Sequence, residues 1–146
     1  MELKRKMVVP IPQSHRNLLD EPIHAVLATM MPNGQPQSTI VWCNYDGNHI
    51  LVNTTRERQK GKNMQGNPKV TLLVIDPKDA GRWIEVRGVV ELIETGALEH
   101  LDEITRQYTN NLHYYGDIFP IEQREKETRI ICKIQPTKVN LDAIHK

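Results

Sequence analysis

The chain has 146 residues, enough for one domain with a single hydrophobic core, and its 19 basic and 18 acidic residues give a formal net charge of +1. This balance argues against a nucleic-acid-binding protein. No apolar run is long enough for a membrane span or a signal peptide, and Cys43 and Cys132 lack a metal-binding spacing, so we expect a reduced, cytoplasmic chain without a membrane or metal partner.

Turn signals and apolar patterns along the chain predict an antiparallel sheet. Residues 13–20 are expected to form a short helix, and Asn33-Gly34 and Asp46-Gly47 then supply the positive φ angles of two hairpin turns. Residues 70–75 read V-T-L-L-V-I, which predicts a strand buried on both faces. The expected strands cover residues 23–29, 37–45, 49–53, 70–75, 83–93 and 128–135.

The second half of the chain adds a barrel signal and a helix. Gly88 lies inside the fifth strand, which indicates a bulge or the corner of a barrel, and Pro136 is expected to end the last strand. A helix is expected at 96–108, where apolar residues recur every three or four positions, and a long loop at 110–127. Six strands with two packed helices predict a mainly β (α+β) fold, a six-stranded antiparallel barrel with flanking helices.

The most distinctive stretch is residues 51–67, which read L-V-N-T-T-R-E-R-Q-K-G-K-N-M-Q-G-N. This pattern predicts the end of a strand and then a helix that a capping box of Thr54 and Glu57 opens. Because a helix N-terminus has a partial positive charge, each cation there costs about 0.3–1 kcal/mol unless an anion such as a phosphate offsets it. A solvated basic face explains the same residues. The cations are Arg56, Arg58, Lys60 and Lys62.

Motifs along the chain resemble those of the pyridoxamine 5′-phosphate oxidase-like superfamily. They are P-N-G-Q-P, Q-S-T-I-V-W, D-G-N-H-I-L-V-N-T-T, R-Q-K-x-K-N-M and R-W-I-E-V-R-G. The resemblance covers about residues 12–139 and implies one domain over residues 1–146, a split β-barrel of the FMN-binding type. Within the superfamily the chain is most similar to the subgroup that binds the deazaflavin coenzyme F420.

This resemblance implies an oxidoreductase that transfers a hydride from reduced coenzyme F420 to a small conjugated or unsaturated acceptor. The cofactor carries the hydride chemistry, so no protein side chain is expected to act as a nucleophile. Alternatives are an FMN-binding oxidoreductase and a non-catalytic carrier or sensor of a flavin or of F420. The chain ends V-N-L-D-A-I-H-K without the arginine- and histidine-containing substrate site of the vitamin B6 oxidase, so oxidation of vitamin B6 is not expected.

The resemblance also implies which residues hold the cofactor. One strand lines the ring, the next strand ends under the ribityl chain, and the basic helix holds the phosphate. Two further residues reach the cofactor of the partner subunit in a homodimer. The residues that line the ring are Gln37, Ser38, Thr39, Ile40 and Val41, and those under the ribityl chain are Val52, Asn53 and Thr54. The residues that hold the phosphate are Arg58, Gln59, Lys60, Lys62 and Asn63. The two that reach the cofactor of the partner subunit are Trp83 and Arg87.

Structural roles also explain several of these residues. Trp83 fits a core position, and Arg87 fits a surface cation paired with a neighbouring glutamate. Tyr114 and Tyr115 are candidates to cover the site, whereas Tyr108 fits a packing role. The six histidines show no ligand spacing, so no metal is expected.

The choice between F420 and FMN depends on charge. FMN stops at its phosphate, whereas F420 continues into a polyglutamyl tail with several carboxylates. Arg56, Lys60 and Lys62, in addition to Arg58, are more cations than one phosphate needs. This surplus favours F420 as the cofactor and leaves FMN as the alternative.

Overall fold

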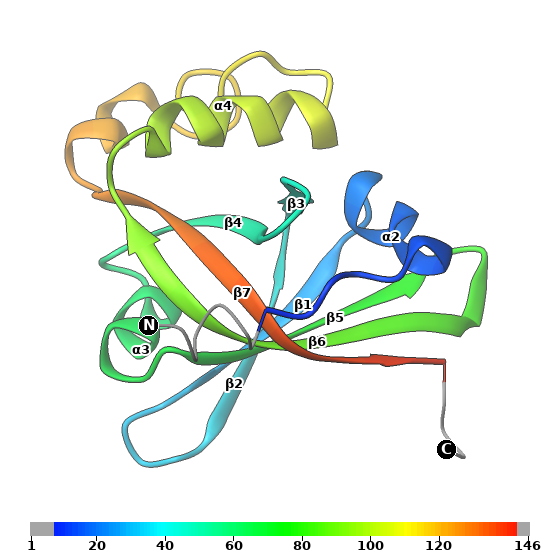
Figure 1. Cartoon of the computed structure of the whole chain (residues 1–146). Coiled ribbons are helices and arrows are strands. Elements are labelled where there is room, and N and C mark those ends of the chain that lie inside the picture. The colour runs from blue at the N-terminus through cyan, green and yellow to red at the C-terminus, as the bar shows by residue number, and fades with distance from the viewer. Residues whose placement is uncertain (1–7, 143–146) are drawn as a thin grey trace.

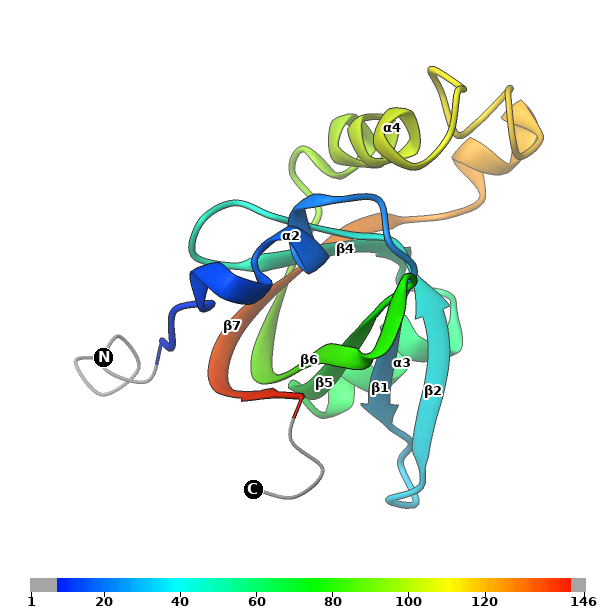
Figure 2. The same ribbon diagram turned by 90° about the vertical axis from the view of Figure 1, so that its right-hand side faces the viewer.

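The computed structural model describes residues 8–142, which are organised around one antiparallel sheet. Its strands pair in the order β2-β1-β5-β6-β7-β4-β3, and the sheet curls around the core (Figure 2). The predicted mainly β (α+β) split-barrel fold is confirmed. The strands are β1 (Ala25–Met30), β2 (Pro36–Val41), β3 (Cys43–Tyr45), β4 (Ile50–Thr55), β5 (Lys69–Asp76), β6 (Asp79–Ile93) and β7 (Arg129–Leu141).

The barrel closes through the chain itself at Trp42. The two edge strands of the sheet, β2 and β3, are consecutive in sequence and separated only by this residue. Val41 pairs with Ala25 of β1, whereas Cys43 pairs with Val52 of β4. The strand expected at 37–45 is therefore two strands, because the chain bends there as it changes neighbours, and the sheet has seven strands in place of six.

Strand β7 continues through Pro136, so the prediction that this proline ends the strand was wrong. Pro136 lies opposite Gly88, where the register between β6 and β7 shifts after Arg87. A bulge interrupts the hydrogen-bond ladder, so it accommodates a residue that has no N–H to donate. The bulge predicted at Gly88 is confirmed, and a Cβ at this position would lie 2.5 Å from the carbonyl oxygen of Gln135.

The core fills the inside of the curled sheet. Alternate residues of each strand point inward, and Val70, Leu72 and Val74 of β5 are buried in this way. The outer face of β5 is not covered in the single chain, where Ile75 is 43% exposed. The expectation that this strand is buried on both faces therefore does not hold for one chain taken by itself.

Helices pack outside the barrel (Figure 1). Helix α4 lies across the end of the barrel beside β3 and β4, and its apolar face is buried as predicted (Figure 1). None of the helices in residues 8–142 is long and apolar enough to cross a membrane. The helical elements are η1 (Gln13–His15) and α2 (Asn17–Asp20), where one short helix was expected, then α3 (Gln59–Gly66), α4 (Ala97–Tyr108) and η2 (Ile121–Glu125), which lies within the expected loop.

Helix α3 begins at Gln59, later than the sequence indicated. The pairing of β4 with β7 continues to Thr55 opposite Arg129, so Thr54 stays extended and cannot cap the helix. The hydroxyl of Thr55 instead accepts a bond from the backbone N–H of Arg58 (3.1 Å). The predicted capping box is therefore not formed, and Arg56 and Arg58 lie in the connection before the helix.

Gly61 allows α3 to pack against the end of β4, because a Cβ there would collide with the carbonyl oxygen of Thr55. We expect Gly61→Ala to lower the free energy of unfolding by about 1–3 kcal/mol, the usual cost of overpacking. Gly66→Ala is the matched control, since Gly66 lies in the same helix with no atom near its missing Cβ, and it should be neutral or slightly stabilising. Denaturant titrations measure both, and equal stabilities of the two variants would contradict this packing.

Candidate functional site

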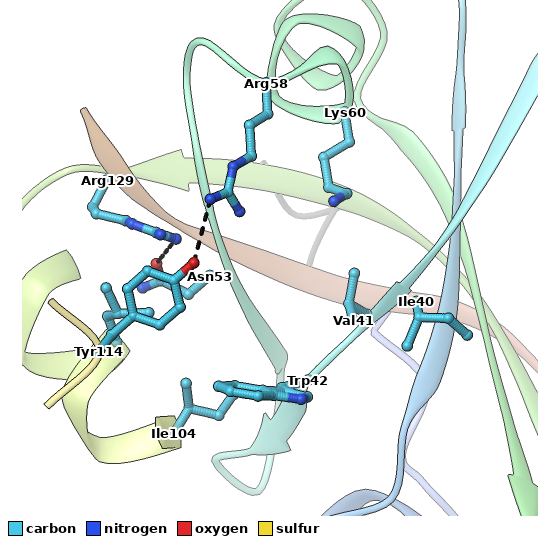
Figure 3. Close-up of a pocket in the computed structure, with 10 residues that line it drawn as sticks. Ile40, Val41, Trp42, Asn53, Arg58, Lys60, Ile104, Tyr114 and Arg129 are labelled. Atoms are coloured by element: carbon cyan, nitrogen blue, oxygen red, sulfur yellow. Dashed lines mark hydrogen bonds between the residues drawn. The ribbon is translucent and has the colours of Figure 1, made fainter. Parts of the chain in front are cut away.

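A cavity of about 200 Å³, here called the barrel-end pocket, opens beside the Trp42 corner (Figure 3). The junction of β2 and β3, strand β4, the start of α3, helix α4 and the start of β7 all contribute side chains to it. Residues far apart in the sequence therefore meet in one place. The lining residues are Ile40, Val41, Trp42, Asn53, Arg58, Lys60, Leu101, Ile104, Tyr114 and Arg129.

One wall of the pocket is cationic and consists of Arg58, Lys60 and Arg129 (Figure 3). Burial lowers the pKa of Lys60, and the positive charges of Arg58 and, more weakly, Arg129 lower it further. The three cations therefore repel one another, and an anion in the pocket would relieve that repulsion. Glu127 balances part of the charge, with its carboxylate 3.6 Å from Nη2 of Arg58 and 3.9 Å from Nη2 of Arg129.

The opposite wall is apolar and includes Trp42, Leu101 and Ile104. The Trp42 ring stacks on Tyr108, with ring centroids 5.3 Å apart and planes 15° apart. The Tyr108 hydroxyl accepts a bond from the backbone N–H of Cys43 (3.0 Å), which holds the stack in place. The packing role expected for Tyr108 agrees with these contacts. A pocket with these two walls fits a ligand with an anionic group and a flat apolar body.

Asn53 lines the pocket, but its amide is fully engaged with the protein. Its Nδ2 donates to the carbonyl oxygen of Ala97 (2.9 Å) and lies 3.0 Å from Nδ1 of His100, while its Oδ1 accepts a bond from Arg129 (3.2 Å). Burial lowers the pKa of His100, which favours the neutral ring that can accept this bond. Asn53 therefore positions Arg129 and the start of α4.

The predicted site residues fall in several places. Ile40, Val41, Asn53, Arg58 and Lys60 line the barrel-end pocket. Val52 is fully buried in the core, and the buried hydroxyls of Thr39 and Thr54 have no hydrogen-bond partner within residues 8–142.

A separate polar network joins Gln37, Gln59 and Asn63. Nδ2 of Asn63 donates to Oε1 of Gln37 (3.2 Å), and its Oδ1 accepts a bond from Gln59 (2.8 Å). These contacts tie α3 to β2, so the three residues position the helix that carries Lys60. Lys62 is exposed on the same helix.

Ser38, Trp83 and Arg87 lie on the outer face of the sheet, away from the pocket. Ser38 and Trp83 line a shallow apolar depression on the strands β1, β2, β5 and β6, and Trp83 pairs across strands with Ile75. Arg87 is exposed and forms an ion pair with Glu85 (3.3 Å). A single chain therefore does not bring these residues to the pocket.

Several pocket residues were missed from the sequence. Trp42 follows the predicted segment directly, Leu101 and Ile104 belong to a helix face expected to be only packing, and Arg129 is a single cation at the start of an apolar strand. Arg56, in contrast, does not add to the cationic wall, because it pairs with Glu94 (2.7 Å).

The histidines, cysteines and carboxylates of residues 8–142 form no group of three or more that could hold a metal ion. His145 lies outside the described residues. Cys43 and Cys132 are both buried, and burial raises the pKa of each thiol to about 12, so neither is a reactive thiolate at neutral pH.

One family model and several solved structures match the chain. The family model of pyridoxamine 5′-phosphate oxidase matches residues 11–141. A solved F420 reductase is 30% identical over 89% of this chain and 98% of its own, with a TM-score of 0.77. A conserved hypothetical protein from Mycobacterium tuberculosis is 24% identical over 92% of this chain and 85% of its own, with a TM-score of 0.71, and this likeness supports the fold alone.

A putative pyridoxamine 5′-phosphate oxidase from Listeria innocua also shares the fold. It is 18% identical over 95% of this chain and 97% of its own, with a TM-score of 0.64. No curated protein matches the sequence of the chain.

Proposed function

The chain belongs to the pyridoxamine 5′-phosphate oxidase family, and on that premise we propose that it is an oxidoreductase that uses coenzyme F420 and transfers a hydride to a small conjugated or unsaturated acceptor. The observation that carries the proposal is the barrel-end pocket, where Arg58 and Lys60 face an apolar wall. The likeness to an F420 reductase at 30% identity supports F420 over FMN.

The residues of the pocket fit a flavin-type cofactor with a phosphate. An arginine offers a planar pair of donors to phosphate oxygens, and a lysine adds a point charge. Burial is the main cause of the lowered pKa of Lys60, and the positive charges of Arg58 and Arg129 lower it further. When bound, reduced F420 supplies the hydride. Arg58 and Lys60 would hold the phosphate, and Trp42 and Ile104 would exclude water from the apolar side.

The size of the pocket supports a site that is shared between two chains. Its volume of about 200 Å³ is below the roughly 300–1,000 Å³ of typical ligand pockets. We therefore propose a homodimer in which the outer sheet face of one subunit completes the site of the other. Trp83 and Arg87 lie on that face, which also carries the exposed side chains of Ile75 on β5 and Ile40 on β2.

The homodimer is tested by sedimentation at micromolar concentration, where we expect about twice the chain mass of 16.9 kDa. Ile75→Glu should dissociate the dimer, because it places a charge on the apolar face. Leu112→Glu is the control, since Leu112 is also exposed but lies in the connection after α4. A stable monomer of the parent protein would contradict the dimer and the roles of Trp83 and Arg87.

The phosphate role is tested with two neighbouring arginines. Arg58→Ala should weaken binding of F420 or FMN by about 1.5–3 kcal/mol, the range for hydrogen bonds to charged groups. Arg56→Ala should leave binding unchanged, because Arg56 pairs with Glu94 outside the pocket. Fluorescence titration measures both, and equal affinities for the two variants would show that Arg58 is only a surface cation.

The choice of cofactor is tested by titrating the purified protein with F420 and with FMN. We expect F420 to bind more tightly, because exposed Lys62 remains for the carboxylates of its tail. The margin should shrink as salt rises, since charges farther apart than about 8 Å are screened at physiological ionic strength. Stoichiometric FMN in the purified protein, with no affinity for F420 at low salt, would instead support the FMN-binding oxidoreductase.

A further inference from the structure

Arg129, the first residue of β7, has an unused donor. Its side chain is only 3% exposed. Its Nε donates to the Tyr115 hydroxyl (2.9 Å) and its Nη1 to Oδ1 of Asn53 (3.2 Å). Its Nη2 is buried and makes no hydrogen bond within residues 8–142. The nearest carboxylate, that of Glu127, is 3.9 Å away, which is too far for a hydrogen bond.

Such a donor is costly. A guanidinium is always charged, and a buried N–H of a charged group without an acceptor loses its hydration with nothing in return. Arg129 lies in the wall that also holds Arg58 and Lys60, and Glu127 is the carboxylate that ion-pairs with both arginines. Three cations and one carboxylate leave two positive charges, which equal in size the charge of the terminal phosphate of FMN and exceed the single negative charge of the phosphate diester in F420.

The surroundings of Arg129 fix its guanidinium. Asn53 holds one side, and the Tyr114 ring lies over the guanidinium, with its centroid 4.7 Å from the central carbon (Figure 3). The centroid of the Tyr115 ring is 5.4 Å from the same carbon. The Tyr114 hydroxyl is 3.4 Å from Nη2 of Arg58, a long hydrogen bond. A phosphate that binds Arg58 would replace this bond, and the ring contacts of Tyr114 with Arg129, Tyr115 and Phe119 would then have to break for the ring to turn aside.

We propose that Arg129 is a third anion-binding residue of the barrel-end pocket, and that its Nη2 donates to the cofactor phosphate once the Tyr114 ring has turned aside. The proposal rests on the proposed function of the same pocket. It adds a residue of the last strand to the phosphate site and assigns Tyr114 as the cover of that residue. Glu127 then acts as an internal anion that competes with the phosphate for both arginines.

The test compares FMN with riboflavin, which differ only in the phosphate, and F420 with its deazaflavin core, which lacks the phosphate together with the polyglutamyl tail. Arg129→Gln should weaken binding of FMN and F420 by about tenfold or more, the effect of one lost hydrogen bond to a charged group. Binding of the phosphate-free ligands should not change. A purely structural role of Arg129 would weaken all four ligands alike, and thermal unfolding shows whether the variant is folded.

If Arg129→Gln does not fold, a second comparison tests the role of Arg129 without changing that residue. In an Arg58→Ala background, Glu127 keeps Arg129 as its ionic neighbour, so Glu127→Gln should tighten FMN binding by up to about fivefold, the range for a partly exposed ion pair. An unchanged FMN affinity of Arg129→Gln, or of Glu127→Gln in the Arg58→Ala background, would overturn the role of Arg129. If Arg58→Ala still weakens binding in that case, the proposed function stands. A parent protein that binds none of the four ligands would overturn both.

Discussion

The site exists because the barrel closes through a bend in the chain and not through a pair of strands. Strands β2 and β3 form the two edges of the sheet, yet only Trp42 separates them. Backbone groups at such a bend lack strand partners and need others. Tyr108 of α4 supplies one, since its hydroxyl accepts a bond from the backbone N–H of Cys43 and lies 2.9 Å from the carbonyl oxygen of the same residue. Helix α4 is thereby fixed against this corner, where its residues Leu101 and Ile104 line the barrel-end pocket.

The charges around this opening follow from the same geometry. The register of β4 with β7 places Thr55 opposite Arg129, so the connection that carries Arg58 leaves the sheet beside the first residue of β7. Three cations then share a partly dry space with one carboxylate, where burial lowers the pKa of Lys60 and the two arginines lower it further. A pocket for an uncharged flat ligand does not need three cations in its wall. A wall that keeps this repulsion is best explained by an anionic group on the ligand.

Local signals in the sequence were enough for the fold class but not for the whole site. The Asn33-Gly34 and Asp46-Gly47 turns and the bulge at Gly88 depend on neighbouring residues, and the sequence showed them. The start of α3 was misplaced because pairing of β4 with β7, more than 70 residues apart in the chain, overrides the capping signal. Arg129 joins the pocket through that same distant pairing. No pattern near it in the sequence reveals its neighbours.

The apolar outer face is the last feature that one chain does not explain. The sequence of β5 is apolar on both faces, but the core covers only the inner residues such as Leu72. Ile75 is left 43% exposed, opposite Trp83 on β6, and Ile40 at the rim of the barrel-end pocket is 62% exposed. A strand with two apolar faces normally has both covered. Ile40 belongs both to this face and to the pocket wall, so a second subunit that covers the face would also adjoin the pocket. The same subunit would then explain both the exposed apolar face and the small volume of the pocket in one chain.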